Sequence, residues 1–408
     1  MKFKTLDDVE LKSKTVFCRI DMNCPIDEKT KLPVLSERII AHAQTIFELA
    51  NKGAKTVVLA HQGRKGDEDF TSLKEHSKML KKQVNKLARK AGSLKPKLKF
   101  VSDVCGKKAQ KAIKHLLEGQ ILVLDNVRLL DDETNFGKTG KSQLVDSLLP
   151  LCDIFVLDAF SVSHRAHASV VGFSSKPCIA GRVMEKELKA LSSFENPKKP
   201  VVFILGGAKP DDSLPILSAW LEGNKLEYAL CGGTLANLML MASGESIGKS
   251  KEFLDKSKAT EKLEVAKQLY VKFEKQIILP TDLVLDENGK ANIISTSSLP
   301  SQFEIHDIGP ATIKKYKKII KSAGSIVLNG PMGVYEKEEF SIGTKSILKA
   351  ISKSSAFSLL GGGHTIEALK KFRIKHEKFG YVSLSGKALI EFLCGDKLPG
   401  VEMLEKST

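Results

Sequence analysis

Short apolar runs alternate with amphipathic stretches along the chain, and this alternation predicts two α/β halves. In the first half, strands are expected at residues 15–20, 56–60, 121–124 and 154–157, and helices at residues 37–52 and 73–91. Continuous apolar strands separated by helices are typical of a parallel sheet that is covered on both faces. The predicted fold class is therefore α/β, with two doubly wound, Rossmann-like parallel-sheet domains facing each other across a hinged cleft.

The boundary between the two halves is predicted at residues 181–200. Residues 182–195 have an amphipathic helical period, and the sequence Asn196-Pro197-Lys198-Lys199-Pro200 then stops the helix. We therefore expect an N-terminal domain over residues 1–180, a connecting helix and linker over 181–200, and a C-terminal domain from residue 201 to 380.

The second half repeats one device: an apolar strand runs into glycines and then into a helix. It occurs at Gly206-Gly207, at Gly232-Gly233 and at Gly361-Gly362-Gly363. Glycine allows close approach of a backbone, and a helix N-terminus offers free N–H groups to phosphate oxygens. Parallel sheets bind nucleotides at the carboxyl ends of their strands. The pattern predicts a nucleotide-binding domain, although neither GxxxxGKS nor GxGxxG occurs in the sequence.

Composition narrows the class of protein. The chain has 408 residues, 42% hydrophobic and 27% charged, which is typical of a folded globular protein. No apolar run approaches the roughly 20 residues of a membrane span, so we expect no membrane contact. The first ten residues are too polar for a secretory signal, which favours the cytoplasm. The seven cysteines lack CxxC spacing and are expected to be reduced thiols.

The net charge of +16 comes from 56 lysines and only 8 arginines. The lysines lie on helix faces, which favours a solvated basic surface; an anionic small substrate or a nucleic acid is the alternative partner. Arginine grips carboxylates and phosphates with two parallel hydrogen bonds. Because most arginines precede residue 190, we interpret the first half as an oxyanion-binding half, with structural ion pairs as the alternative for each: Arg19, Arg38, Arg64, Arg89, Arg128, Arg165 and Arg182.

A polar trio ends the first predicted strand. Arg19, Asp21 and Asn23 share one face because side chains alternate along a strand. Unpaired burial would cost about 1–3 kcal/mol per group. A hydroxylated, anionic ligand would supply the missing partners.

The segment that contains this trio, residues 17–27, resembles the N-terminal signature of the phosphoglycerate kinase family, as does Glu37-Arg38-Ile39 after it. Further motifs of that family follow in the family's order along almost the whole chain: His61-Gln62-Gly63-Arg64, Asp125-Asn126-Val127-Arg128-Leu129, Asp158-Ala159-Phe160, His164-Arg165-Ala166-His167, Gly206-Gly207-Ala208-Lys209, Asp307-Ile308-Gly309-Pro310, residues 329–336, Gly361-Gly362-Gly363-His364-Thr365 and Leu398-Pro399-Gly400-Val401.

The resemblance implies reversible phosphoryl transfer between 1,3-bisphosphoglycerate and ADP, which gives 3-phosphoglycerate and ATP. It implies that the N-terminal domain binds the phosphoglycerate through Asp21, Met22, Asn23, Arg38, His61, Gln62, Gly63, Arg64, Arg128 and Arg165. It implies that the C-terminal domain binds the Mg²⁺-nucleotide through Lys209, Gly309, Asn329, Glu336, Gly361, Gly362, Gly363, His364 and Thr365, with Glu336 on the ribose. Arg38, Lys209 and Gly363 match its catalytic positions.

In this chemistry the acceptor is a carboxylate that is already ionised at neutral pH, so no general base or covalent nucleophile is expected. His61 and His164 are then orienting donors, and His167 is either an orienting or a structural residue. The resemblance also implies hinge closure and a C-terminal segment, residues 381–408, that returns to the first domain. We expect a monomer, with a homodimer as the alternative.

Three positions depart from the common family pattern. Ser213 stands where a second lysine is usual, His364 replaces an aspartate that is commonly linked to the metal, and Lys387 lies in place of a glycine in the late glycine turn. The first two departures resemble the archaeal branch. They leave the metal ligand open, and Lys387 either supplies the missing charge or faces solvent. A non-catalytic homologue that binds phosphoglycerate or nucleotide, and a nucleic-acid-binding basic protein, are the competing functions.

Overall fold

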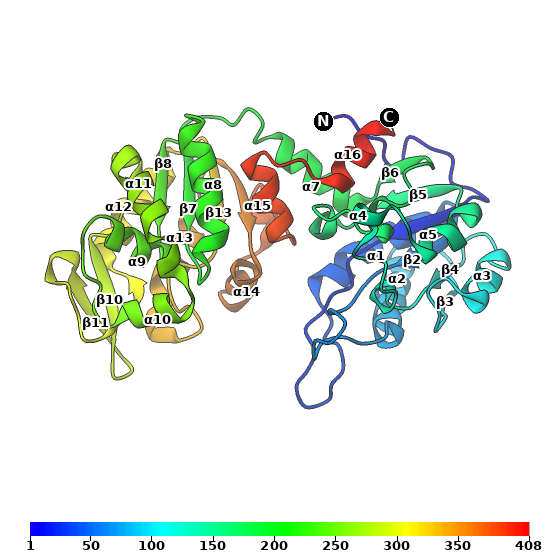
Figure 1. The fold of residues 1–408 in the computed structure, drawn as a ribbon, viewed down its shortest axis with the longest axis horizontal. Helices are drawn as coiled ribbons and strands as arrows, with labels where there is room; N and C mark the ends of the chain where they lie inside the picture. The colour runs from blue at the N-terminus through cyan, green and yellow to red at the C-terminus, as the bar shows by residue number, and fades with distance from the viewer. Residues whose placement is uncertain (408) are drawn as a thin grey trace. The chain divides into compact units, whose positions relative to one another are not determined.

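The computed structural model describes residues 1–407, without the side chains of residues 210–212. The chain divides into two compact units (Figure 1). Unit 1 comprises Met1–Lys189 and the chain from Lys397 onward, and unit 2 comprises Ala190–Asp396. Each unit contains a six-stranded parallel sheet with helices, so the predicted fold class of two parallel-sheet α/β domains is confirmed.

The sheet of unit 1 has the strand order β3-β4-β2-β1-β5-β6, and all its pairings are parallel. Its central strands are apolar and buried, as a sheet covered on both faces requires. The strands are β1 (Thr15–Arg19), β2 (Lys55–Leu59), β3 (Leu98–Phe100), β4 (Ile121–Val123), β5 (Ile154–Leu157) and β6 (Cys178–Ala180).

The helices of unit 1 include the last helix of the chain, α16, which lies beside β6 (Figure 1). There Ser407 Oγ accepts a hydrogen bond of 2.8 Å from the backbone N–H of Cys178. The helices are α1 (Glu37–Asn51), α2 (Lys74–Lys90), α3 (Lys107–Lys114), α4 (Phe136–Thr139), α5 (Gln143–Leu148), α6 (Ala168–Val171) and α16 (Pro399–Lys406). Helix α7 (Arg182–Ser192) begins in unit 1 and ends in unit 2.

The large sheet of unit 2 has the order β15-β14-β13-β7-β8-β9 and is also parallel. The chain first builds outward from β7 and then returns to build outward on the other side through β13, so the topological switch point lies between β7 and β13. The strands are β7 (Val201–Leu205), β8 (Tyr228–Cys231), β9 (Ile277–Ile278), β13 (Ser325–Asn329), β14 (Phe357–Gly361) and β15 (Tyr381–Val382).

A second, antiparallel sheet of unit 2 was not among the sequence predictions. It has the order β11-β10-β12, formed by β10 (Asp282–Glu287), β11 (Lys290–Ser295) and β12 (Glu304–Ile308). Asn288 and Gly289 connect β10 to β11 with φ values of 54° and 85°. Positive φ at both central residues is what a two-residue hairpin turn requires, which explains the Asn-Gly pair.

The helices of unit 2 are α8 (Pro210–Glu222), α9 (Gly233–Ala242), α10 (Ser250–Lys256), α11 (Leu263–Phe273), α12 (Pro310–Ser322), α13 (Ile342–Ile351), α14 (Gly363–Lys371) and α15 (Lys387–Cys394). The expected return to the first domain at residue 381 differs from the structure. β15 pairs with β14, and α15 packs on α8, where Trp220 Nε1 donates a 2.6 Å hydrogen bond to the Leu393 carbonyl. These contacts keep the chain in unit 2 up to Asp396.

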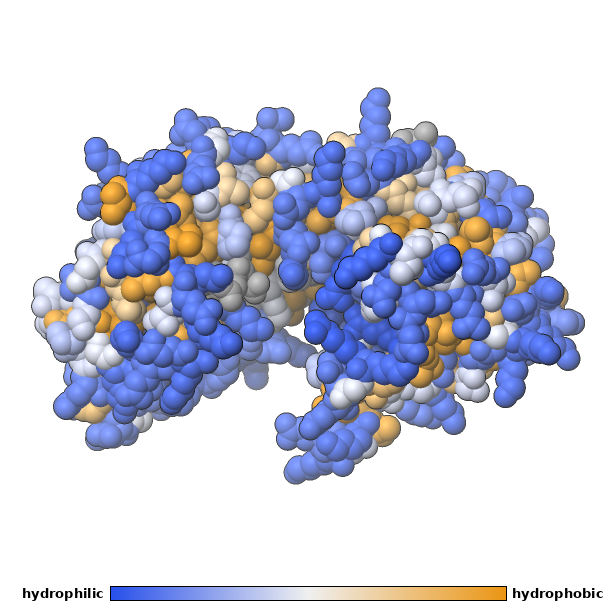
Figure 2. Space-filling model, in the orientation of Figure 1, coloured by the Kyte–Doolittle hydropathy of each residue, from blue (hydrophilic) through white to orange (hydrophobic). Residues whose placement is uncertain are grey.

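Lysines occupy the exposed helix faces, for example Lys81 and Lys86 on α2, whereas Leu80 and Val84 of that helix are buried. Hydrophilic residues accordingly cover much of the face drawn in Figure 2. All seven cysteines are free thiols, and six of them are buried. None of the described helices has the length and apolar character needed to cross a membrane.

Candidate active site

Four neighbouring strands of unit 1, β4, β2, β1 and β5, end at one edge of the sheet. Asp21 and Asn23 follow β1, His61 and Arg64 follow β2, Arg128 follows β4, and Arg165 follows β5. Parallel strands bring these carboxyl ends together, so the residues predicted to bind phosphoglycerate are placed along one edge. Two other arginines of the first half take no part: Arg89 lies on the exposed face of α2, and Arg182 pairs with Asp7, Glu48 and Glu185.

The buried carboxylate of Asp21 is held by three groups. Ser161 Oγ donates to it at 2.5 Å, the Asn23 N–H donates at 2.9 Å, and Arg38 Nη1 lies 3.2 Å from its Oδ2. Burial raises the pKa of Asp21, but the nearby Arg38 charge and these hydrogen bonds outweigh burial and hold the pKa below its ordinary value. Asp21 is therefore an ionised group that orients Arg38.

His61 is a buried, neutral imidazole. Its Nδ1 lies 3.0 Å from Nη2 of Arg19, and burial together with the Arg19 charge lowers the pKa of His61 well below its ordinary value. A guanidinium can only donate, so Nδ1 accepts and the ring proton lies on Nε2. His61 therefore carries an N–H that can be donated to an oxyanion.

The interior side of this edge is braced by Glu133. Ser169 donates to the carboxylate of Glu133 from its backbone N–H at 2.9 Å and from its Oγ at 2.6 Å, and the same Oγ accepts from Arg19 Nε at 2.8 Å. Burial, followed by the Arg165 charge, lowers the pKa of His167 to about 3, and its Nδ1 lies 3.9 Å from Glu133. This placement favours the structural alternative for His167.

A basic cluster, defined here as Arg19, Arg64, Arg128 and Arg165, lies at this edge. Burial, and then the charges of the other three, lower the pKa of Arg128 to about 10. Four neighbouring guanidinium charges repel one another, and a bound oxyanion relieves that repulsion. Arg128 also donates to the carbonyl of Gly63, which fixes the loop after β2.

Gln62 and Gly63 shape that loop from within. Gln62 is fully buried; its Nε2 donates to the carbonyls of Cys24 and Asp69, both at 3.1 Å, and its Oε1 accepts from Cys24 N at 2.7 Å. Gly63 has a φ of +62° and donates its N–H to Asn23 Oδ1 at 2.9 Å. The Gln62 amide is thus engaged by the protein, which makes Gln62 a positioning residue. Met22 is likewise fully buried.

In unit 2, the strands β14, β13, β7 and β8 end side by side, and the predicted glycine loops follow three of them. Gly207 and Gly330 both have positive φ. A Cβ on Gly330 would lie 2.6 Å from the Gly206 carbonyl oxygen, so the backbones of these two loops contact each other where no side chain would fit. Lys209 is exposed and precedes the first turn of α8. A cation and a helix N-terminus therefore meet beside the switch point.

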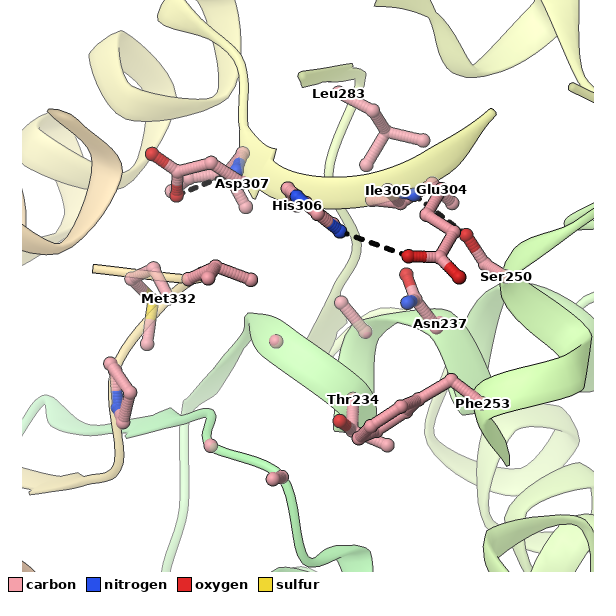
Figure 3. Close-up of a pocket in the computed structure, with 18 of the residues that line it drawn as sticks. Thr234, Asn237, Ser250, Phe253, Leu283, Glu304, Ile305, His306, Asp307 and Met332 are labelled. Carbon is pink, nitrogen blue, oxygen red and sulfur yellow. Dashed lines mark hydrogen bonds and ion pairs between the residues drawn. The ribbon is translucent and has the colours of Figure 1, made fainter. Parts of the chain in front are cut away.

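A cavity of about 320 Å³ opens in unit 2 between α9, β12 and the loop after β13 (Figure 3). Its walls are mostly glycine and apolar side chains, with a smaller number of polar groups among them, which is typical of a small-molecule site. Of the residues predicted to bind nucleotide, Glu336 and His364 line it. Seven others lie outside its lining: Lys209, Gly309, Asn329, Gly361, Gly362, Gly363 and Thr365.

Four of these residues, Gly309, Asn329, Gly362 and Thr365, contact the nearby loops. Gly309 begins α12 and donates to the Asp282 carbonyl at 3.0 Å, and Thr365 Oγ1 accepts from Gly330 N at 3.0 Å. A Cβ on Gly362 would lie 2.9 Å from Asn329 Oδ1. Sequence analysis missed several residues that line the cavity, notably Asn237, Glu304 and His306.

The position of the usual metal-linked aspartate carries the exposed His364. Its Nδ1 lies 3.9 Å from Glu336 and 3.7 Å from Glu367. Magnesium prefers oxygen ligands, so the imidazole does not fit this ion, whereas the two carboxylates do. In the part of the chain that the structure describes, no group of three or more His, Cys, Asp or Glu is placed to hold a metal.

The two other departures are also placed. Ser213 is fully buried on α8, and its Oγ has no hydrogen-bond partner among the described residues. Lys387 is the first residue of α15; its side chain is 68% exposed and lies 3.5 Å from Glu391, one turn along the helix. This placement favours the solvent-facing alternative for Lys387.

Comparison with known proteins gives consistent matches. The family model described as phosphoglycerate kinase matches residues 6–396. A phosphoglycerate kinase of Methanothermobacter thermautotrophicus is 39% identical over 100% of this chain and 97% of its own length. A phosphoglycerate kinase of Methanococcus maripaludis is 40% identical over 99% of this chain and 98% of its own length.

Solved structures agree with these sequence matches. The crystal structure of phosphoglycerate kinase from Pyrococcus horikoshii OT3 superposes with a TM-score of 0.90 at 35% identity, and the match covers 99% of both chains. The structure of phosphoglycerate kinase from Coxiella burnetii gives a TM-score of 0.81 at 33% identity, again over 99% of both chains.

Proposed function

This chain belongs to the phosphoglycerate kinase family, and we propose that its two units divide the family's reaction between phosphoglycerate and nucleotide. The reaction is reversible phosphoryl transfer between 1,3-bisphosphoglycerate and ADP, and the enzyme class is a phosphotransferase with a carboxyl acceptor. The observation that carries the proposal is that two different kinds of site lie on different units. Unit 1 contains the basic cluster, whereas unit 2 contains the largely apolar cavity.

We assign the phosphoglycerate to the strand ends of unit 1. Arg38, oriented by Asp21 at 3.2 Å, is a bidentate donor for a carboxylate or phosphate. Asn23 and the Nε2–H of His61 are hydrogen-bonding groups for the glycerate end. Arg64, Arg128 and Arg165 of the basic cluster then receive the distant phosphate, while the buried Arg19 is engaged by Ser169 and His61. Asp21 acts through Arg38, and Gln62 acts through the loop that it fixes.

We assign the nucleotide to the cavity of unit 2. The base lies in the apolar walls, Glu336 accepts the ribose hydroxyls, and the phosphates extend toward Lys209 and the glycine loops beside the switch point. Magnesium is part of the nucleotide substrate, and Glu367 is the carboxylate proposed to approach it.

The chemistry needs positioning and positive charge. The attacking carboxylate of 3-phosphoglycerate is ionised at neutral pH, so no side chain has to remove a proton. Arg38 and Lys209 are the cations proposed to stabilise the charge that is spread over the transferring phosphoryl group. The neutral state of His61 suits a donor that orients substrate without exchanging protons.

Glu336→Gln is expected to raise the KM for ATP about five- to tenfold, with little change in kcat. A carboxylate that binds ribose hydroxyls contributes equally to the ground and transition states, so its loss appears mainly in KM. Steady-state kinetics with each substrate varied will measure both constants. Glu339→Gln, a neighbouring exposed carboxylate, is the matched control. A larger loss for phosphoglycerate than for ATP would contradict the ribose assignment.

Transfer between substrates on different units requires that the units approach when both substrates are bound. Closure brings donor and acceptor oxygens into line and excludes water, which would otherwise hydrolyse ATP. We expect the radius of gyration from small-angle scattering to be smallest in the ternary complex with a nonreactive ATP analogue. An identical radius in the free, binary and ternary states of an active preparation would remove closure from the mechanism.

The alternative of a non-catalytic homologue rests on the three departures Ser213, His364 and Lys387, the first two of which leave a charge and a carboxylate missing from the common pattern. We propose instead that Lys209 alone suffices as the cation beside α8. We also propose that the enzyme acts in the cytoplasm as a monomer, and sedimentation velocity of the purified chain will test the oligomeric state.

A further inference from the structure

We propose that Asn237 reads the base of the nucleotide and, together with Glu304, selects adenine over 6-oxopurines. The inference rests on the proposed function, because it assumes that the nucleotide base enters the cavity of unit 2. It concerns which hydrogen-bonding edge of a base that cavity accepts.

Asn237 is a polar residue on the mostly apolar helix α9. It lies on α9, lines the cavity and is only 7% exposed. Its Oδ1 is shielded from solvent and accepts no hydrogen bond from any residue that the structure describes. Buried polar atoms are nearly always paired, and an unpaired one is costly. Because the terminal torsion of asparagine is soft, the amide can turn to meet a ligand that brings the missing donor.

Glu304 supplies a second hydrogen-bond acceptor in the cavity, near Asn237. Figure 3 shows Asn237 rising from α9 toward Glu304, whose side chain descends from β12. His306 Nε2 lies 3.2 Å from Glu304 Oε2, and its Nδ1 lies 3.2 Å from Asp286. The edge of the His306 ring packs against Phe340 with centroids 4.8 Å apart. The carboxylate of Glu304 is therefore held in place at the cavity wall.

Adenine matches this pair of groups. Its 6-amino group has two hydrogens, one for Asn237 Oδ1 and one for Glu304, and the adjacent ring nitrogen accepts from the Asn237 NH₂. The pairing of an asparagine amide with the amino group and ring nitrogen of adenine is a recurrent mode of base recognition. A 6-oxopurine places an acceptor at the same point, where it faces the negative charge of Glu304. Asn237 and Glu304 therefore distinguish adenine from 6-oxopurines by hydrogen bonding and charge as well as by size.

Calorimetric titration of the whole protein with ADP, IDP and purine riboside diphosphate tests the inference without any substitution. IDP carries an oxygen at position 6, and the purine riboside carries only hydrogen there. We expect ADP to bind about 10- to 100-fold more tightly than either analogue, the range that one good bidentate pair provides. Equal affinity for the three ligands would overturn the base-reading role.

Glu304→Gln is expected to remove most of this preference, because it removes the negative charge that disfavours a 6-oxo group. Asn237→Leu, of similar volume, should weaken ADP binding, because it removes the partner of the 6-amino group and the ring nitrogen. Thr234→Val is the matched control on the same wall, and the ratio of ADP to IDP affinity should stay at the wild-type value. Unchanged ADP affinity in Asn237→Leu, or an unchanged ratio of ADP to IDP affinity in Glu304→Gln, would contradict the proposal. Failure of the wild-type protein to bind any of the three would instead overturn the assignment of the cavity to nucleotide, and the base reading with it.

Discussion

Replacing Arg38 with alanine should lower kcat/KM for 3-phosphoglycerate by about 100- to 1,000-fold, the range measured when one donor to developing charge is removed. Arg38 Nη1 lies 3.2 Å from Asp21 and donates to the Asn23 carbonyl at 3.3 Å, so one side chain connects both polar residues that follow β1. Its loss removes the cation and leaves Asp21 facing the substrate as an uncompensated anion.

Calorimetry distinguishes a specific loss of 3-phosphoglycerate binding from a general loss of folded protein. Arg38→Ala should bind 3-phosphoglycerate much more weakly and bind ADP with wild-type affinity, because ADP is assigned to unit 2. Arg89→Ala, an exposed arginine of the same unit, is the matched control and should change neither. Unchanged affinity of Arg38→Ala for 3-phosphoglycerate would refute the assignment of this edge.

Lys209→Ala should lower kcat by about 100-fold or more while it changes the KM for ATP only a few-fold. The lysine precedes α8 beside the glycine loop of Gly206 and Gly207, where a cation acts on the transferring phosphoryl group. Because Ser213 is buried and uncharged on the same helix, it cannot compensate for the loss.

Lys387→Ala is the matched control for this variant. Lys387 is exposed and paired with Glu391, so its removal should leave kcat within about threefold of the wild-type value. Comparable losses in the two variants would mean that Lys387 supplies the charge missing at Ser213. A kcat of Lys209→Ala within threefold of wild type would exclude Lys209 from the transfer step.

Much of this organisation could be predicted from the sequence because it depends on local patterns. The apolar runs at residues 15–20 and 154–157 correspond to β1 and β5, and parallel pairing then places the residues after them at one edge. The scarcity of arginine marked the first half as the oxyanion side. It could not separate Arg182, whose partners Asp7 and Glu48 are distant in the sequence, from Arg165.

The antiparallel sheet was missed although Asn288-Gly289, a strong hairpin signal, stands between β10 and β11. Without that sheet, β12 could not be placed, and Glu304 and His306 could not be brought to the cavity. Asn237 lies on a mostly apolar helix, and only the three-dimensional structure shows that its amide oxygen lacks a partner. The end of unit 2 was misplaced because the two-residue strand β15 is too short to be recognised from its pattern.

The most direct test of the catalytic assignment is a coupled assay that follows ADP production from MgATP with and without 3-phosphoglycerate. We predict rapid ADP production that depends on 3-phosphoglycerate, with negligible ATP hydrolysis in its absence, because the proposed cations of the two units, Arg38 and Lys209, meet at the transferring phosphoryl group only when both substrates are bound. Tight binding of both ligands without turnover would contradict this assignment and would identify the chain as a non-catalytic member of the family.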